Sequence, residues 1–168
     1  DLEPVHQSAL TCLGQALAAL DAARLSEGSR IGAMIESRLV QLEALVGNLQ
    51  GRLPSIRERI RARLEDRLAN LTLPTEPNRE RFEQELSLAL SKMDVDEELD
   101  RLGSHVAEVR KAMNATEPSG RRLDFLMQEF NREANTLSSK SQDAETTRVA
   151  VDMKVLIEQM REQVQNVE

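Results

Sequence analysis

The chain has 168 residues, of which 40% are hydrophobic and 30% charged, and its formal net charge is −7. This charge argues against indiscriminate binding to polyanions, because phosphate contacts need clustered cations. The chain contains no Trp or Tyr and only three Phe, whereas good helix formers are abundant. Runs of β-branched or aromatic residues with a period of two are missing. The composition therefore predicts an all-α fold.

The single cysteine, Cys12, stands among Ala and Leu residues. It cannot form an internal disulfide, and its surroundings favour a small core residue in a reducing, cytoplasmic setting. No hydrophobic run reaches the length of a membrane span, and no signal peptide is recognisable, so no membrane association is expected. Because the chain begins at Asp1 and not at Met, we expect it to be a fragment that lacks an N-terminal part.

Residues 1–72 are predicted to form a long helical hairpin of extended rods. Leucines in helical spacing predict a helix over residues 1–25, and a period near 3.5 continues over residues 29–71. Gly51 and Pro54 interrupt this pattern, so a kink or short break is expected there. A continuous rod over residues 29–71 would be roughly 60 Å long. Such a length favours an antiparallel hairpin or an oligomeric frame.

Residues 79–168 are predicted to form a C-terminal helical domain, arranged as a bundle. Proline-containing stretches at residues 72–78 and 114–119 are the expected linkers. Apolar residues spaced by three and four define the helices between and after them. These helices are expected at residues 79–113, 120–137 and 144–167.

The helix predicted over residues 79–113 carries a polar stripe beside its apolar face. The members are spaced four, three and four apart and share one side of a helix: Asp94, Glu98, Arg101 and His105. The pattern alone favours a solvated row of ion pairs, each worth a few tenths of a kcal/mol. A functional face is the alternative, because a histidine near carboxylates can bind a metal or act as a general acid or base.

Two carboxylates, Glu129 and Glu133, lie one turn apart on the helix that starts at residue 120. If Glu98 and His105 face them, the four side chains would form an oxygen-rich site. Mg²⁺ or Mn²⁺ would suit it better than zinc, because no cysteine ligands accompany them. The alternative is that neighbouring arginines neutralise these carboxylates.

The start of the same helix, Gly120-Arg121-Arg122, is suited to a phosphate group. Free backbone N–H groups, the helix dipole and two guanidinium groups would converge there, although an ordinary exposed arginine pair after a linker is an equal alternative. A second arginine-rich block, residues 52–67, is interleaved with acidic residues. No aromatic residues interrupt that block, so RNA would bind it through backbone charge.

Three segments of the chain resemble the C-terminal region of the YicC family in order and spacing. They are DVDEELDRLGSH (94–105), GRRLDFLMQEFNREANTLSSKS (120–141) and KVLIEQMREQVQNVE (154–168). The resemblance implies a bacterial, cytoplasmic endoribonuclease, once labelled a stress protein. Family members form ring-like hexamers, cut RNA with the help of a divalent metal, and carry an N-terminal domain that we expect to be missing from this sequence. Expected partners are RNA, copies of the chain and other RNA-degradation proteins.

The resemblance also carries roles over to matching positions. Catalytic residues are expected at Glu98, His105, Glu129, Glu133 and Arg101. The metal, Mn²⁺ or Mg²⁺, would be bound by Glu98, His105, Glu129 and Glu133, and RNA phosphates by Arg121, Arg122, Arg132, Gln128 and Asn131. Further candidates are Glu97, Asp124 and, more weakly, Glu27 and Gly28. The implied mechanism is metal-assisted phosphodiester cleavage, in which arginines neutralise the scissile phosphate.

Two other functions fit the same pattern. The chain could be a helical oligomerisation or scaffold module whose polar stripes contact other subunits. It could also be a carboxylate bundle for metal storage or redox chemistry, although the spacing differs from the Glu-x-x-His motif of di-iron bundles.

Overall fold

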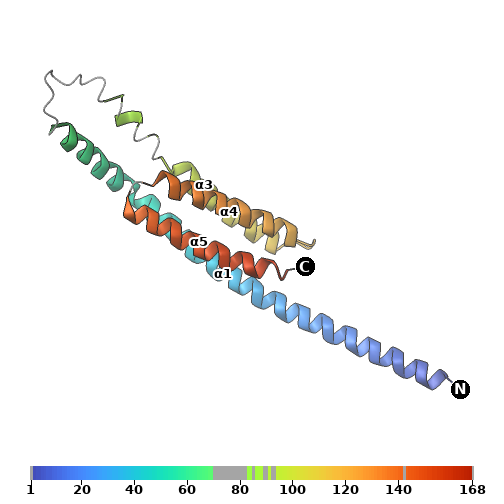
Figure 1. Cartoon of the computed structure of the whole chain (residues 1–168). Helices are drawn as coiled ribbons and strands as arrows, with labels where there is room; N and C mark the ends of the chain where they lie inside the picture. The colour runs from blue at the N-terminus through green and yellow to red at the C-terminus, as the bar shows by residue number, and fades with distance from the viewer. Residues whose placement is uncertain are drawn as a thin grey trace.

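The computed structural model describes residues 2–69, 83–84, 86–88, 91, 94–141 and 143–167. Within these residues the fold is helical and contains no strand, which confirms the predicted all-α class (Figure 1). None of the described helices is both long and hydrophobic enough to cross a membrane. The linker predicted at residues 72–78 lies outside the described residues. The main elements are α1 (Glu3–Ala69), α3 (Asp96–Met113), α4 (Gly120–Lys140) and α5 (Ala144–Val164).

α1 is one helix of 67 residues that continues through Pro54. The predicted hairpin is therefore wrong for residues 3–69, and so is the break near Gly51 and Pro54. A proline inside a helix removes one backbone hydrogen bond and typically costs about 3 kcal/mol. Here Leu53 and Ile56, on either side of Pro54, are both buried against the bundle. Tertiary packing offsets the local cost and keeps the helix continuous.

The antiparallel partners of α1 come from the C-terminal half of the chain. α1 packs against α3 and α5, and α4 packs against the same two helices, so the four helices form an up-and-down bundle (Figure 1). Polar contacts fix the direction of α3 against α1. Gln50 donates to Asp100 at 3.2 Å, and Arg110 donates to Glu36 at 2.7 Å. Because α1 and α4 share the partners α3 and α5, they lie diagonally across the bundle.

A single hydrophobic core runs along the bundle and draws residues from all four helices. Phe130, Leu39, Leu102 and Ile157 are among its largest fully buried side chains. At the rim of this core, Arg110 binds Glu36 and Glu43 with Nη–Oε distances of 2.7 Å to each. This clamp joins α1 to α3, and its hydrogen bond lowers the pKa of Glu43 below the ordinary value.

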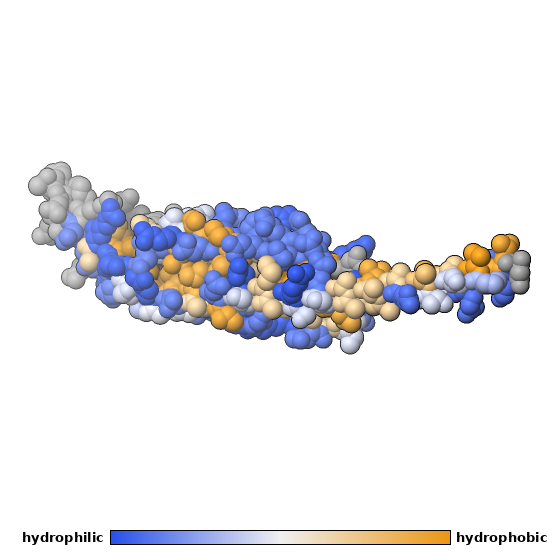
Figure 2. Space-filling view, turned by 90° about the horizontal axis from the view of Figure 1, so that it is seen from below, coloured by the Kyte–Doolittle hydropathy of each residue, from blue (hydrophilic) through white to orange (hydrophobic). Residues whose placement is uncertain are grey.

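The first part of α1 projects from the bundle as an arm, residues 2–30, in which every described side chain is exposed. Its leucines, including Leu10, Leu13 and Leu17, are more than half exposed, and Figure 2 shows hydrophobic surface along this projection. Cys12 is also exposed. The expectation that it is a core residue is wrong, because α1 meets its partners only from Ile31 onwards.

Candidate metal and RNA site on α3 and α4

The candidate site forms where α3 and α4 pack in antiparallel directions. The apolar faces of the two helices meet in the core, with Leu102 and Val106 of α3 and Met127 and Phe130 of α4 fully buried. Residues beside these faces are carried to the edge of the interface, where they are partly shielded from water. The polar stripes predicted on both helices therefore lie along one seam.

Three of the four predicted metal ligands come together in this seam. One ligand atom from each of His105, Glu129 and Glu133 lies within 4.8 Å of the others; we call these residues the carboxylate–histidine cluster. The Glu133 side chain is only 5% exposed and that of Glu129 is 25% exposed. Nε2 of His105 is buried and has no hydrogen-bond partner among the described residues. Its ring packs edge-on against Phe130, with centroids 5.7 Å apart.

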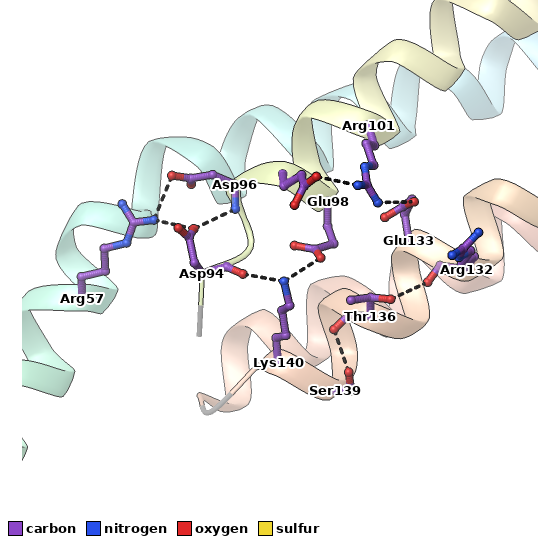
Figure 3. A network of polar contacts seen from close by, with 11 residues as sticks. Arg57, Asp94, Asp96, Glu98, Arg101, Arg132, Glu133, Thr136, Ser139 and Lys140 are labelled. Carbon is purple, nitrogen blue, oxygen red and sulfur yellow. Dashed lines mark hydrogen bonds and ion pairs between the residues drawn. The ribbon is translucent and has the colours of Figure 1, made fainter. Parts of the chain in front are cut away.

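Arg101 neutralises the most buried carboxylate of the cluster. Its Nη1 lies 3.3 Å from Glu133 Oε1, and its Nη2 lies 2.5 Å from Glu97 Oε1 (Figure 3). The hydrogen bond to Glu133, supported by the charge of Glu97, raises the pKa of Arg101. Arg101 is half exposed, so its guanidinium group also faces solvent. The structure thus contains the arginine neutralisation that the sequence offered as an alternative to a metal.

Glu98, the fourth predicted ligand, lies outside the carboxylate–histidine cluster. Its Oε1 accepts a hydrogen bond from Lys140 Nζ at 2.7 Å, and the same Nζ donates to the Asp94 carbonyl at 3.0 Å (Figure 3). Its other carboxylate oxygen is buried without a described partner. Glu98 and His105 are seven residues apart, or about 10 Å along the helix axis. Glu98 and His105 therefore share one face of α3 but lie at different positions along its axis.

Lys140 was not among the predicted site residues. The helix predicted to end at residue 137 continues to Lys140, and this extra turn brings the ammonium group to Glu98. Asp94, the other end of the predicted stripe, is bound by Arg57 of α1 at 3.1 Å, and Arg57 also binds Asp96 at 2.9 Å. Asp94 and Glu98, the first two residues of the stripe, therefore belong to an ion-pair network that is separate from the cluster.

The predicted phosphate-binding residues differ in their present contacts. Arg122 is paired with Glu108, and Gln128 donates to Asp124 at 2.9 Å. Arg132 lies 3.9 Å from Glu129 and is 72% exposed, and Asn131 is half-buried. Arg121 is exposed and makes no ion pair with any described residue. Arg121 and Arg132 are the guanidinium groups with most freedom to reach a phosphate.

The C-terminal end of the chain closely approaches the helix start at Gly120. A Cβ atom at Gly120 would lie 2.6 Å from the carbonyl oxygen of Val167, so a side chain at this position would clash with the backbone there. The phosphate grip at Gly120-Arg121-Arg122 stays a prediction, and the C-terminal end of the chain lies beside it. Glu27 and Gly28, the weaker candidates, line a separate cavity of about 490 Å³ at the base of the arm, together with Leu20 and Met113.

The sequence matches known proteins over a region that includes the candidate site. A family model described as "Endoribonuclease YicC-like, C-terminal" matches residues 49–168. A protein of Haemophilus influenzae named "Probable endoribonuclease YicC" is 42% identical over 168 residues, which is 100% of this chain and 58% of the relative. A protein of the same name from Clostridioides difficile is 33% identical over 154 residues, which is 91% of this chain and 53% of the relative.

The chain thus spans somewhat more than half the length of these curated relatives. The matched region contains α3, α4 and α5 and the part of α1 beyond residue 49. It includes the three segments that resemble the family, residues 94–105, 120–141 and 154–168. That resemblance is confirmed, and the chain belongs to the YicC-like family.

Proposed function

We propose that this chain carries the catalytic centre of a metal-dependent endoribonuclease. The two relatives are named probable endoribonucleases, which supports RNA cleavage as the activity. The observation that carries the proposal is the carboxylate–histidine cluster, in which ligand atoms from two helices converge within 4.8 Å. The buried Nε2 of His105 strengthens it, because a buried polar atom without a partner is costly unless something binds it.

The donor set fits a divalent cation. One imidazole nitrogen and two carboxylate oxygens suit Mn²⁺ or Mg²⁺, with His105, Glu129 and Glu133 as the ligands. Such an ion supplies Lewis-acid stabilisation of phosphate charge and lowers the pKa of a bound water molecule. Phe130 holds the His105 ring at the cluster by edge-on packing, which reduces the entropy lost when the ring becomes a ligand.

The remaining side chains supply positioning and charge. Arg101 keeps the desolvated Glu133 carboxylate neutralised and has a second partner in Glu97. Its half-exposed guanidinium can therefore turn towards an RNA phosphate while Glu97 still holds it. Glu129 is the more exposed of the two cluster carboxylates, so its oxygen that does not bind the cation is the better placed to accept a proton from a hydroxyl group that enters from solvent. Arg132 and Arg121 extend the positive charge along α4.

The matched test uses Glu129→Gln and Glu133→Gln, with Glu158→Gln as a control for charge loss on the exposed surface of α5. Cleavage of a short labelled RNA is followed with and without Mn²⁺, and Mn²⁺ binding is measured separately by calorimetry. Both cluster variants should lose metal-dependent cleavage, and the control should retain it. Unchanged cleavage in cluster variants that still fold and assemble would rule the centre out.

A second candidate function is assembly. The exposed leucines of the arm favour packing against another helix, and we propose a homo-oligomer, ring-like in the longer protein, that uses this surface. Native mass measured alongside the cleavage assay separates the two functions. A chain that assembles but shows no metal-dependent cleavage, alone or within the longer protein, would be a scaffold module.

A further inference from the structure

α4 presents an aromatic ring to solvent beside the carboxylate–histidine cluster. Phe125 is 59% exposed, whereas Phe130 on the same helix is fully buried. The chain has no Trp or Tyr, so exposed aromatic surface is scarce. Single exposed hydrophobic residues are common on proteins and need no explanation by themselves. Phe125 is of interest because it lies one helical turn before Glu129 of the cluster.

Phe125 belongs to a row of residues spaced four apart along α4: Arg121, Phe125, Glu129 and Glu133. Neighbours in such a row lie next to each other on the helix surface, because each step rises about 6 Å and turns about 40° around the helix. Exposure falls along the row. Arg121 and Phe125 are exposed, while the Glu129 and Glu133 side chains are 25% and 5% exposed. The row thus leads from solvent into the cluster, and Phe125 lies at its entrance.

A nucleotide at this entrance would meet complementary groups at neighbouring turns. The guanidinium of Arg121 suits a phosphate and the ring of Phe125 suits the adjoining base, and neither contact needs a metal. A cation held by the carboxylates would suit a second phosphate. Single-stranded RNA is recognised mainly by stacking unpaired bases on aromatic side chains, and such stacking tolerates any base because each has a π-face. A base inside a duplex cannot reach a lone ring in this way.

We propose that Phe125 is a stacking platform for an unpaired nucleobase next to the cleavage site, so that the substrate is single-stranded at that nucleotide. This inference rests on the proposed function, because it assumes that RNA reaches the carboxylate–histidine cluster. It adds the aromatic contact that the arginine block of residues 52–67 lacks. It also assigns base recognition to α4 and not to the basic part of α1.

The absence of Trp and Tyr makes a direct optical test possible. In Phe125→Trp the new indole is the sole strong fluorophore of the chain. Addition of a short single-stranded RNA in the presence of EDTA should quench its emission, whereas the same RNA with an abasic site, or a blunt duplex, should not. Val40→Trp is the matched control, since Val40 is 53% exposed on α1, which packs against α3 and α5. Its emission should not change.

Affinity variants separate stacking from simple hydrophobic contact. Phe125→Ala and Phe125→Leu should each weaken binding of single-stranded RNA roughly 5- to 150-fold, the range expected for loss of one stacked base. Phe125→Tyr should bind as the unmodified chain does. Equal binding by Phe125→Leu, or equal quenching by abasic RNA, would overturn the proposal. So would quenching that depends on protein concentration without RNA, because the ring would then be covered by a second copy.

The failure of this inference is distinguishable from failure of the proposed function. Binding is measured without metal, so loss of the cleavage proposal leaves the fluorescence result intact. Conversely, metal-dependent cleavage that requires Glu133, combined with an unresponsive Phe125→Trp, would leave the catalytic centre standing and remove the stacking contact.

Discussion

Replacing Lys140 by Met removes the cation that neutralises a buried carboxylate. Glu98 is 4% exposed and accepts from Lys140 at 2.7 Å, and its second oxygen has no described partner. Removing one partner of a fully buried ion pair typically costs about 3–5 kcal/mol. Lys140 is itself 32% exposed, so water can replace part of its interaction. We therefore expect Lys140→Met to lower the free energy of unfolding by about 2–3 kcal/mol.

The assay is urea denaturation followed by far-ultraviolet circular dichroism, because the chain has no Trp or Tyr to report unfolding by fluorescence. Lys154→Met, at an exposed position of α5, is the control and should change stability by less than about 0.5 kcal/mol. The double variant Glu98→Gln, Lys140→Met should recover much of the loss, since it leaves no unpaired charge. A small loss in Lys140→Met, or strictly additive single effects, would refute the assignment of this pair as a coupled buried interaction.

Three further predictions follow from contacts around the bundle. Arg101→Met leaves the Glu133 carboxylate without its cation, so Mn²⁺ should raise the melting temperature more in this variant than in the unmodified chain; an equal or smaller rise would contradict the charge-compensation model. Because its arginine partner lowers the pKa of Glu43 in the folded state, this pair stabilises the fold above the unfolded-state pKa of about 4.3 and ceases to do so as pH falls through the lower folded value. Arg110→Met should therefore cost up to about 1 kcal/mol at pH 7 and less at pH 3, measured by urea denaturation at both values. Gly120→Ala must displace a backbone carbonyl that would lie 2.6 Å from the new Cβ and should destabilise the chain by about 1 kcal/mol, whereas Gly103→Ala in open space should stabilise it by a similar amount; the two melting temperatures should move in opposite directions.

Periodicity predicted α4 and α5 well, because each buries one regular apolar face. The helix predicted over residues 79–113 is wrong at its start, because residues 94 and 95 are not helical and α3 begins at Asp96. α4 begins at Gly120 and α5 at Ala144, as expected from the spacing. The start of α5 is also fixed locally, since the Asp143 carboxylate accepts hydrogen bonds from the backbone N–H groups of Glu145 and Thr146 at 3.1 and 3.0 Å. Such signals act over a few residues and can be recognised without knowledge of the tertiary structure.

The failures all depend on packing between distant segments. Pro54 was expected to break α1, but burial of the residues beside it outweighs the missing hydrogen bond. Leu10 and its neighbours have the spacing of a core face, yet α1 runs past the end of its partners there and leaves them exposed. A hydrophobic period predicts which side of a helix is apolar. It does not predict whether another helix lies opposite that side.

For the candidate site, the sequence predicts which residues share a helix face but not which of them lie close together. The shared faces of α3 and α4 were evident from the sequence, and three of the proposed ligands converge as expected. Glu98 was grouped with them because it shares the face of His105, but two helical turns separate the two residues. Only the length of α4 decides that Lys140 reaches Glu98. Axial distance, applied to the same stripe, would have separated Glu98 from the cluster.

The arm and the bundle share one helix, with no joint between them. Residues 3–30 extend about 40 Å beyond the packed part of α1. A rotation of α1 by about 5° against α3 and α5 would therefore move the tip of the arm by about 4 Å. Conversely, a force applied at the tip of the arm would act on the packing of α1 over this whole length. Arg110 joins α1 to α3, the helix that carries Arg101 and His105. A partner that binds the arm and displaces its tip would therefore shift the packing of α1 against α3, the helix that carries part of the cluster.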